Sequence, residues 1–100
     1  MTLNVIPWAN NPDFIWDEYN EYEIARHNVS CFDVEECFEY QDGFKKNFWV
    51  APHNKAKSEP KKYGNRYIVK GSTFGGRKLL IVIEHIGGHW IRPITAWDLE

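Results

Sequence analysis

The sequence LLIVIEHIGGHWIRPIT, residues 79–95, contains the clearest structural pattern of this chain. Gly87-Gly88 separates two runs of apolar and β-branched residues, which is typical of a β-hairpin with a two-residue turn. With that turn, Ile83 would face Arg92 across the hairpin. The run Leu80–Ile83 is apolar at every position. We therefore expect a central strand that is covered on both faces.

Further strands are predicted around this hairpin. Residues 66–70 alternate in hydrophobicity, as a half-buried strand does, and residues 48–50 predict a second short strand. Residues 52–62 are polar, basic and contain proline, which indicates an exposed loop. Pro93 cannot donate to a strand ladder. The last strand is therefore predicted either to lie at a sheet edge or to be bulged beside Arg92.

The first third of the chain has helical patterns instead. Asp17 is a favourable N-cap for a helix over residues 18–27, and Asn28 is suited to its C-terminus. Ser30 and Asp33 resemble a capping box at the start of a second helix. An apolar stripe follows on that helix, formed by Cys31, Val34, Cys37 and Phe38. These patterns predict an α+β fold in which two N-terminal helices pack on a curved antiparallel β-sheet.

The composition is that of one folded domain. The chain has 100 residues, 43 % of them hydrophobic and 16 % aromatic, which is enough for one core. We expect a single domain over residues 1–100 with a loose arm at residues 1–12. No stretch approaches the ~18 apolar residues of a membrane helix, and no signal-peptide pattern is present. Cys31 and Cys37 lack the spacing of a metal site. We expect reduced thiols in a cytoplasmic protein that binds no metal, cofactor or membrane.

Charge is divided sharply along the chain. Residues 1–44 contain ten acidic residues and one basic residue, whereas residues 45–78 contain ten basic residues and one acidic residue. Two interpretations stand side by side. The chain either has two solvated faces of opposite charge, or its basic half forms a surface that attracts phosphates, with salt-dependent affinity.

Short motifs occur in an order that resembles the BrnT family, the ribonuclease toxins of a bacterial type II toxin–antitoxin system. The segment around the first helix matches its signature except at Asn28, where the family has glycine. Over residues 14–98 the matching stretches are Trp16-Asp17-Glu18, Ile24–Ser30, Val34-Glu35-Glu36, Arg66–Gly71, Gly76–Leu79 and Ile91–Asp98.

The resemblance implies a RelE-type fold, metal-independent cleavage of RNA, and neutralisation by a small antitoxin that also binds DNA. His27, Arg66 and Arg92 match positions that such an activity would use. Lys70 and Arg77 are candidates for positioning the substrate. One expected basic residue is missing, because Trp97 stands in its place.

The residue types suit this chemistry on physical grounds. RNA carries its own nucleophile, the 2′-hydroxyl, so a metal-free ribonuclease needs proton transfer and neutralisation of charge on the phosphate. A histidine can exchange protons near neutral pH, which supports the assignment of His27 as acid or base. Arginines donate forked hydrogen bonds to phosphate, which suits Arg66 and Arg92. We expect these three side chains to converge on one open, cation-rich pocket.

Structural interpretations compete with these assignments. His27 suits a helix C-terminus whatever its role, Arg92 would be satisfied by a buried salt bridge to Glu36, and Arg66 could mark a strand edge. Tryptophans at positions 8, 49 and 90 either stack on bases or pack in the protein. The functional alternative to an enzyme is a non-catalytic module that binds a protein or a nucleic acid.

Overall fold

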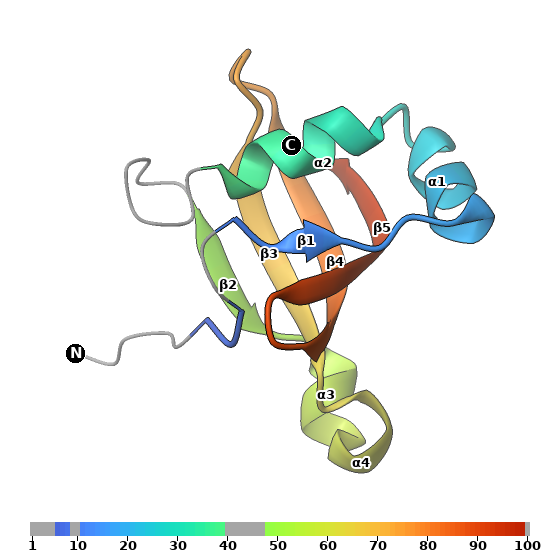
Figure 1. Cartoon of the computed structure of the whole chain (residues 1–100), viewed down its shortest axis with the longest axis vertical. Coiled ribbons are helices and arrows are strands. Elements are labelled where there is room, and N and C mark those ends of the chain that lie inside the picture. The colour runs from blue at the N-terminus through green and yellow to red at the C-terminus, as the bar shows by residue number, and fades with distance from the viewer. Residues whose placement is uncertain (1–5, 9–10, 40–47, 100) are drawn as a thin grey trace.

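The computed structural model describes residues 6–8, 11–39 and 48–99. These residues form an α+β fold with four helices and a five-stranded mixed sheet (Figure 1). The strands lie in the order β1-β5-β4-β3-β2. In chain order the elements are β1 (Asp13–Phe14), α1 (Glu18–Ala25), α2 (Cys31–Phe38), β2 (Trp49–Pro52), α3 (Asn54–Ser58), α4 (Pro60–Tyr63), β3 (Arg66–Ser72), β4 (Lys78–Gly87) and β5 (Trp90–Asp98).

β4 and β5 form the predicted hairpin, but its turn lies one residue later than expected, at Gly88 and His89. Gly88 has a φ of +56°, which glycine adopts without steric cost. The register shifts just before the turn. As a result, Arg92 pairs with Glu84 and not with Ile83. The predicted cross-strand pairs were therefore wrong by one position.

The last strand is bulged, as one of the two alternatives for Pro93 predicted. The register between β4 and β5 shifts by one residue at Ile94. β1 pairs in parallel with the first two residues of β5, Trp90 and Ile91, and Pro93 lies beyond that pairing. The sheet is therefore mixed, and the prediction of a wholly antiparallel sheet was wrong. β1 has only two residues, too short a strand to leave a periodic pattern in the sequence.

The core lies between the sheet and α2, which crosses β3 and β4 (Figure 1). Most of the predicted stripe is buried, since Val34, Cys37 and Phe38 are at most 2 % exposed. The facing positions on the sheet are Val69 of β3 and Leu79, Ile81 and Ile83 of β4, all fully buried. β4 is the middle strand of the five, as predicted.

Part of the predicted loose arm belongs to this core. Trp8 is only 3 % exposed and packs against Phe38 and Tyr67. Its indole ring meets Tyr67 edge-on at a centroid distance of 5.5 Å. Residues 1–5 and 9–10 of that arm, like the expected end of the second helix near residue 41, lie outside the described residues.

α1 begins at the predicted cap and is fixed there by a reciprocal pair of hydrogen bonds. The Asp17 carboxylate accepts from the Asn20 backbone N–H at 2.9 Å, and the Asn20 side-chain oxygen accepts from the Asp17 N–H at 2.8 Å. The Asn20 amide group then donates to the Pro93 carbonyl oxygen at 2.9 Å. The N-terminus of α1 is thus attached to β5.

α1 ends two residues earlier than predicted, at Ala25, and Asn28 terminates it in the left-handed conformation (φ +63°). The Val29 N–H donates to the Ile24 carbonyl at 3.1 Å, and the Asn28 N–H donates to the Ala25 carbonyl at 2.9 Å. This pair of bonds is a Schellman motif. Asn28 therefore occupies the backbone conformation that favours the glycine of the BrnT signature.

The segment predicted as an exposed loop contains two short helices, so that prediction was wrong. The His53 imidazole accepts a hydrogen bond from the Lys55 N–H at 3.0 Å and caps α3. Pro60 opens α4 at a position where its missing N–H is not needed. Within the described residues, none of the helices is both long and apolar enough to cross a membrane.

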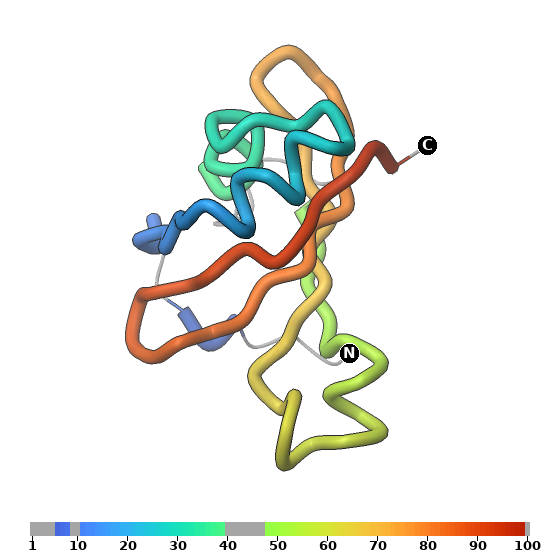
Figure 2. Tube along the Cα trace, turned by 90° about the vertical axis from the view of Figure 1, so that its right-hand side faces the viewer, coloured from blue at the N-terminus to red at the C-terminus, as the bar shows by residue number. Residues whose placement is uncertain are grey.

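The sheet face away from α2, called here the outer face, presents the alternate side chains. Figure 2 shows α2 on one side of β3 and β4, whereas α1 lies beside β5. Register places the outer-face side chains in rows across the strands. One row is Trp49, Lys70, Leu80 and Trp97; the next is Ala51, Ile68, Val82 and Thr95; the last is Arg66, Glu84 and Arg92.

Candidate functional site between α1 and β5

The carboxylate of Glu23 on α1 contacts three side chains at the edge of the sheet. Its Oε2 accepts a hydrogen bond from Thr95 Oγ1 at 2.9 Å and lies 3.3 Å from His27 Nε2. Its Oε1 accepts from Arg26 Nη1 at 2.8 Å. The bond from Thr95, with help from His27 and Arg26, lowers the pKa of Glu23. Glu23 is therefore a stable anion beside the histidine.

This contact determines which nitrogen of His27 is available for proton transfer. An ionised carboxylate accepts hydrogen bonds only, so the imidazole presents an N–H at Nε2 toward Glu23. In the neutral ring, Nδ1 then carries the free lone pair. The His27 side chain is 37 % exposed, so a ligand can reach it. The pair has the arrangement of a base held by a carboxylate.

Arg92 is held by a different carboxylate from the one predicted. Both Nε and Nη2 of Arg92 donate to Asp17 Oδ2, at 3.1 and 2.8 Å. Glu36, the predicted partner, instead accepts from the Phe74 N–H at 2.9 Å. The bond from the Asn20 N–H, followed by that from Arg92, lowers the pKa of Asp17. One aspartate thus caps α1 and positions the arginine.

A hollow of about 320 Å³ opens next to Arg92. Its lining combines the arginine with the Glu23 side of α1 and two exposed tyrosines. The lining residues are Tyr19, Asn20, Tyr22, Glu23, Arg92 and Ile94. Within the described residues, Nη1 of Arg92 has no hydrogen bond, since both bonds to Asp17 use the other two nitrogens. The hollow therefore offers a cationic donor and is lined by Glu23, the partner of His27, but not by His27 itself.

Arg66 lies on the same face of the sheet but two strands away from Arg92. Both residues pair with Glu84, which stands between them on β4. Arg66 Nη2 is 3.5 Å from the Glu84 carboxylate, and its guanidinium lies 4.6 Å from the Tyr63 ring centre. Among the described residues its buried Nε has no hydrogen-bond partner. Arg66 therefore belongs to the α4 end of the outer face.

The expected cation-rich pocket is not what the structure shows. His27, Arg66 and Arg92 each contact a carboxylate, from Glu23, Glu84 and Asp17 in turn. The physical reason is the cost of burying a charge without a partner, because the Arg66 and Arg92 side chains are only 18 % and 28 % exposed. Glu23 contacts His27 and also lines the hollow with Arg92, but His27 follows the C-terminus of α1 whereas Arg92 binds Asp17 at its N-terminus. Arg66 belongs to neither group of contacts.

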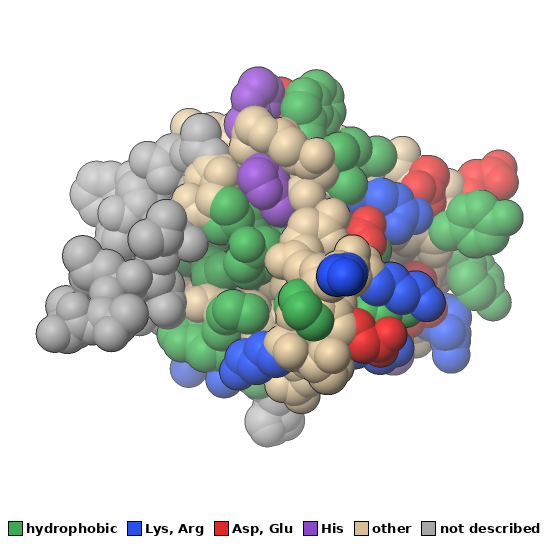
Figure 3. Space-filling view, turned by 90° about the horizontal axis from the view of Figure 1, so that it is seen from below, with side chains coloured by type: hydrophobic (Ala, Val, Ile, Leu, Met, Phe, Trp, Pro, Cys, Tyr) green, Lys and Arg blue, Asp and Glu red, His purple; other side chains and the backbone are tan. Residues whose placement is uncertain are grey.

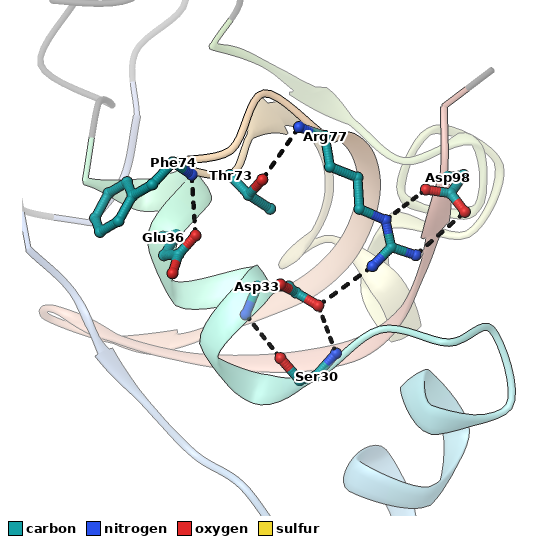
Figure 4. Close-up of polar contacts among 7 residues, drawn as sticks. All are labelled: Ser30, Asp33, Glu36, Thr73, Phe74, Arg77 and Asp98. Carbon is teal, nitrogen blue, oxygen red and sulfur yellow. Dashed lines mark hydrogen bonds and ion pairs between the residues drawn. The ribbon is translucent and has the colours of Figure 1, made fainter.

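The two predicted substrate-positioning residues lie elsewhere. Lys70 Nζ lies 4.6 Å from the ring centre of Trp49 on the outer face. Arg77 binds Asp98 through Nε at 2.7 Å and Asp33 through Nη1 at 3.3 Å (Figure 4). Asp98 raises the already high pKa of Arg77. Arg77 therefore ties the start of α2 to the end of β5, and none of these contacts involves His27 or Arg92.

Trp97 is adjacent to His27, with ring centroids 6.0 Å apart. This is the position at which the BrnT pattern has a basic residue. An aromatic ring of 38 % exposure therefore stands where a second cation beside the histidine would be expected. The departure from the family pattern falls within the candidate site.

The sequence did not reveal the carboxylate partners of His27, Arg66 and Arg92, nor Thr95, which donates a hydrogen bond to Glu23. The i,i+4 spacing of Glu23 and His27 on one helix is a signal that would have found the first pair. No local signal joins Asp17 to Arg92 or Glu23 to Thr95, since these pairs are more than 70 residues apart. The described residues contain no group of three or more His, Cys, Asp or Glu side chains arranged to hold a metal ion.

In comparisons with known proteins, no protein family, no curated protein and no solved structure matches this chain.

Proposed function

We propose that this chain is a metal-independent endoribonuclease toxin of a type II toxin–antitoxin pair, with the RelE-like arrangement of two N-terminal helices on a sheet that the BrnT resemblance implies. The observation that carries the proposal is the Glu23–His27 pair beside the Arg92 hollow. His27 is a reachable base, and Glu23, its partner, lines the hollow in which Arg92 offers a cationic donor. RNA supplies its own nucleophile, so these two functions are sufficient for chemistry.

The reaction proceeds by attack of the 2′-oxygen on the adjacent phosphorus. Nδ1 of His27 takes the 2′-hydroxyl proton as the new P–O bond forms, and the bond to the 5′-oxygen breaks. The leaving oxygen takes a proton from solvent. The products are a 2′,3′-cyclic phosphate and a 5′-hydroxyl. Arg92 Nη1 donates to the phosphate oxygen that gains negative charge, and Asp17 keeps the guanidinium in place.

Cleavage of purified RNA in EDTA tests this proposal. We expect fragments with 2′,3′-cyclic phosphate ends, and we expect His27→Gln to lower the rate at least ~10²-fold. Glu23→Gln should also lower the rate, because it removes the charge that fixes the imidazole tautomer. Lys78→Gln is the control, since Lys78 is exposed and has no place in this site. RNA that stays intact with the unsubstituted protein contradicts the proposal.

A second candidate function is a non-catalytic module that binds a nucleic acid or a protein. His27, Arg66 and Arg92 each contact a carboxylate, and this observation favours the second function. A phosphate bound at any of them would have to share the residue with that carboxylate. It predicts salt-sensitive RNA binding without cleavage under any metal condition, and unchanged binding in His27→Gln.

The toxin assignment has its own test in cells. Induced expression should arrest growth, and co-expression of a short neighbouring gene for an antitoxin should relieve the arrest. Growth arrest that persists in His27→Gln would separate toxicity from the proposed chemistry.

A further inference from the structure

The segment that contains α3 and α4 is a basic lobe, defined here as residues 53–66. It carries five of the chain's twelve Lys and Arg residues and a single acid, Glu59. Lys55, Lys57, Lys61 and Lys62 are exposed, and among the described residues none of their ammonium groups has a carboxylate within 4 Å. Figure 3 looks onto this end of the molecule, where blue side chains stand close together. The lobe therefore has a positive net charge, and its four lysines have no carboxylate partner among the described residues, whereas Arg66 pairs with Glu84.

Three of these cations gather around one aromatic ring. The Tyr63 ring centre lies 5.2 Å from Lys55 Nζ, 5.2 Å from Lys62 Nζ and 4.6 Å from Arg66 Cζ. Like charges repel one another, so this cluster raises the local positive potential. Its effect is visible at His53, where burial first, and then Arg66 and Lys55, lower the pKa. In contrast to His27, Arg92 and Arg66 itself, each of which contacts a carboxylate, Lys55 and Lys62 have no carboxylate partner among the described residues.

We propose that the basic lobe is the docking surface for the phosphate backbone of single-stranded RNA, apart from the α1–β5 site. This inference rests on the proposed function for its choice of RNA. Four lysines without a carboxylate partner in the described part of the chain, two of which lie at the Tyr63 ring with Arg66, match the electrostatic binding of a polyanion.

The lobe continues into the outer face of the sheet. β2, four residues or about 13 Å long, leads from Trp49 to the start of the lobe. Trp49 is 42 % exposed beside Lys70, which combines an aromatic ring and a cation, as single-strand binding surfaces do. Arg66 joins the lobe to the row of Glu84 and Arg92. A strand held at the lobe is thereby directed toward Arg92.

The test measures binding of a fluorescein-labelled oligouridylate of about 12 nucleotides by anisotropy over a range of salt concentrations. All proteins carry His27→Gln so that the probe stays intact. Replacing the four lysines by glutamine should reduce the slope of log K against log salt by about 0.7 for each lysine in contact. Lys62→Gln and Lys78→Gln form a matched pair, each removing one exposed charge, and only the first should change the slope.

Two results would overturn the proposal. One is a four-lysine variant that binds the oligonucleotide with the slope and affinity of its parent. The other is a parent protein that binds polyglutamate as tightly as the oligonucleotide, which would identify an acidic protein segment as the partner. Circular dichroism and the thermal midpoint check that the variants fold.

The inference and the proposed function fail in different ways. A dinucleoside monophosphate has a single phosphate, so it cannot place one phosphate at Arg92 and another at the lobe. With His27 intact, an active enzyme should cleave it equally well in the four-lysine variant. If the dinucleotide is cleaved but oligonucleotide binding does not depend on the lobe, only the docking inference is rejected. If oligonucleotide binding depends on the lobe but no RNA is cleaved, only the enzymatic proposal is rejected.

Discussion

At the scale of single residues, two positions at which the chain departs from the BrnT pattern have different physical consequences. Asn28 stands where that pattern has glycine and adopts φ +63°, because asparagine tolerates the left-handed region better than most residues. Trp97 stands where the pattern has a basic residue and places an aromatic ring beside His27. The first position bears on stability, and the second bears on the proposed cleavage.

Substitutions at Asn28 should separate the conformational effect from side-chain contacts. We expect Asn28→Ala to lower the free energy of unfolding by about 1 kcal/mol, because alanine is disfavoured at positive φ. Asn28→Gly should be neutral or stabilising, because glycine adopts this conformation freely. Urea unfolding measures both. An alanine variant as stable as the parent would show that the Schellman motif does not require this conformation.

Trp97→Arg should increase cleavage. The new guanidinium would stand next to His27, where it can stabilise the charge that develops on the phosphate, and we expect a rise of roughly tenfold or more. Trp97→Ala is the control, since it removes the ring without adding a cation and should not raise the rate. Single-turnover cleavage of a short RNA compares the three proteins. Equal cleavage rates for Trp97→Arg and Trp97→Ala would show that the added charge does not cause any increase.

At the scale of elements, the packing of α2 on β3 depends on a close approach at Gly71. A Cβ atom at Gly71 would lie 2.9 Å from Cys37 Cβ and 3.3 Å from the Cys37 carbonyl oxygen. Because part of this contact is helix backbone, α2 cannot relieve it by rotating a side chain. A glycine in the middle of a strand is thus explained by the helix above it.

Gly71→Ala should destabilise the protein by about 1–3 kcal/mol, the usual cost of overpacking a core. Gly75→Ala is the matched control, because the nearest atom to its added Cβ is Thr73 Oγ1 at 4.0 Å. Thermal or urea unfolding gives the two differences. Similar stabilities for the two variants would mean that α2 can move away from β3 at little cost.

At the scale of the whole molecule, two ion pairs join segments that are far apart in the chain. Asp17 and Arg92 join the start of α1 to β5, and Asp98 and Arg77 join the end of β5 to the turn before β4 and, through Asp33, to α2 (Figure 4). The Asn20 N–H and Arg92 lower the pKa of Asp17, and Arg77 lowers that of Asp98. Both aspartates are therefore easier to ionise in the folded protein than in the unfolded chain.

This linkage predicts how stability depends on pH. A carboxyl with a lowered folded pKa stabilises the protein above its unfolded value, here 3.8 for an aspartate, and that contribution is lost as the pH falls through the folded pKa. We expect the free energy of unfolding to decrease below about pH 4. Asp17→Asn combined with Asp98→Asn should make this decrease shallower, as urea unfolding between neutral and acidic pH can measure. An unchanged slope in the double variant would assign the effect to other carboxyls.

What the sequence by itself determined is local. The caps at Asp17 and Ser30, the stripe of α2 and the β4–β5 hairpin follow from patterns within about ten residues, because helix caps and strand periodicity are written in neighbouring side chains. The same locality explains the error over residues 52–62, where composition indicated a loop but His53 and Pro60 start helices.

Only the tertiary structure decided which charges are satisfied. β1 pairs with β5, Trp8 enters the core, and acids of α1 meet residues of β5 that lie more than 70 positions away. The Arg92 guanidinium is partly buried and therefore needs an anionic partner. In the folded chain this partner is Asp17, which no rule of sequence spacing relates to Arg92. The lysines of α3 and α4 remain outside this compensation, because the chain's acids are concentrated in the first third and the lobe projects from the far end of the sheet (Figure 1).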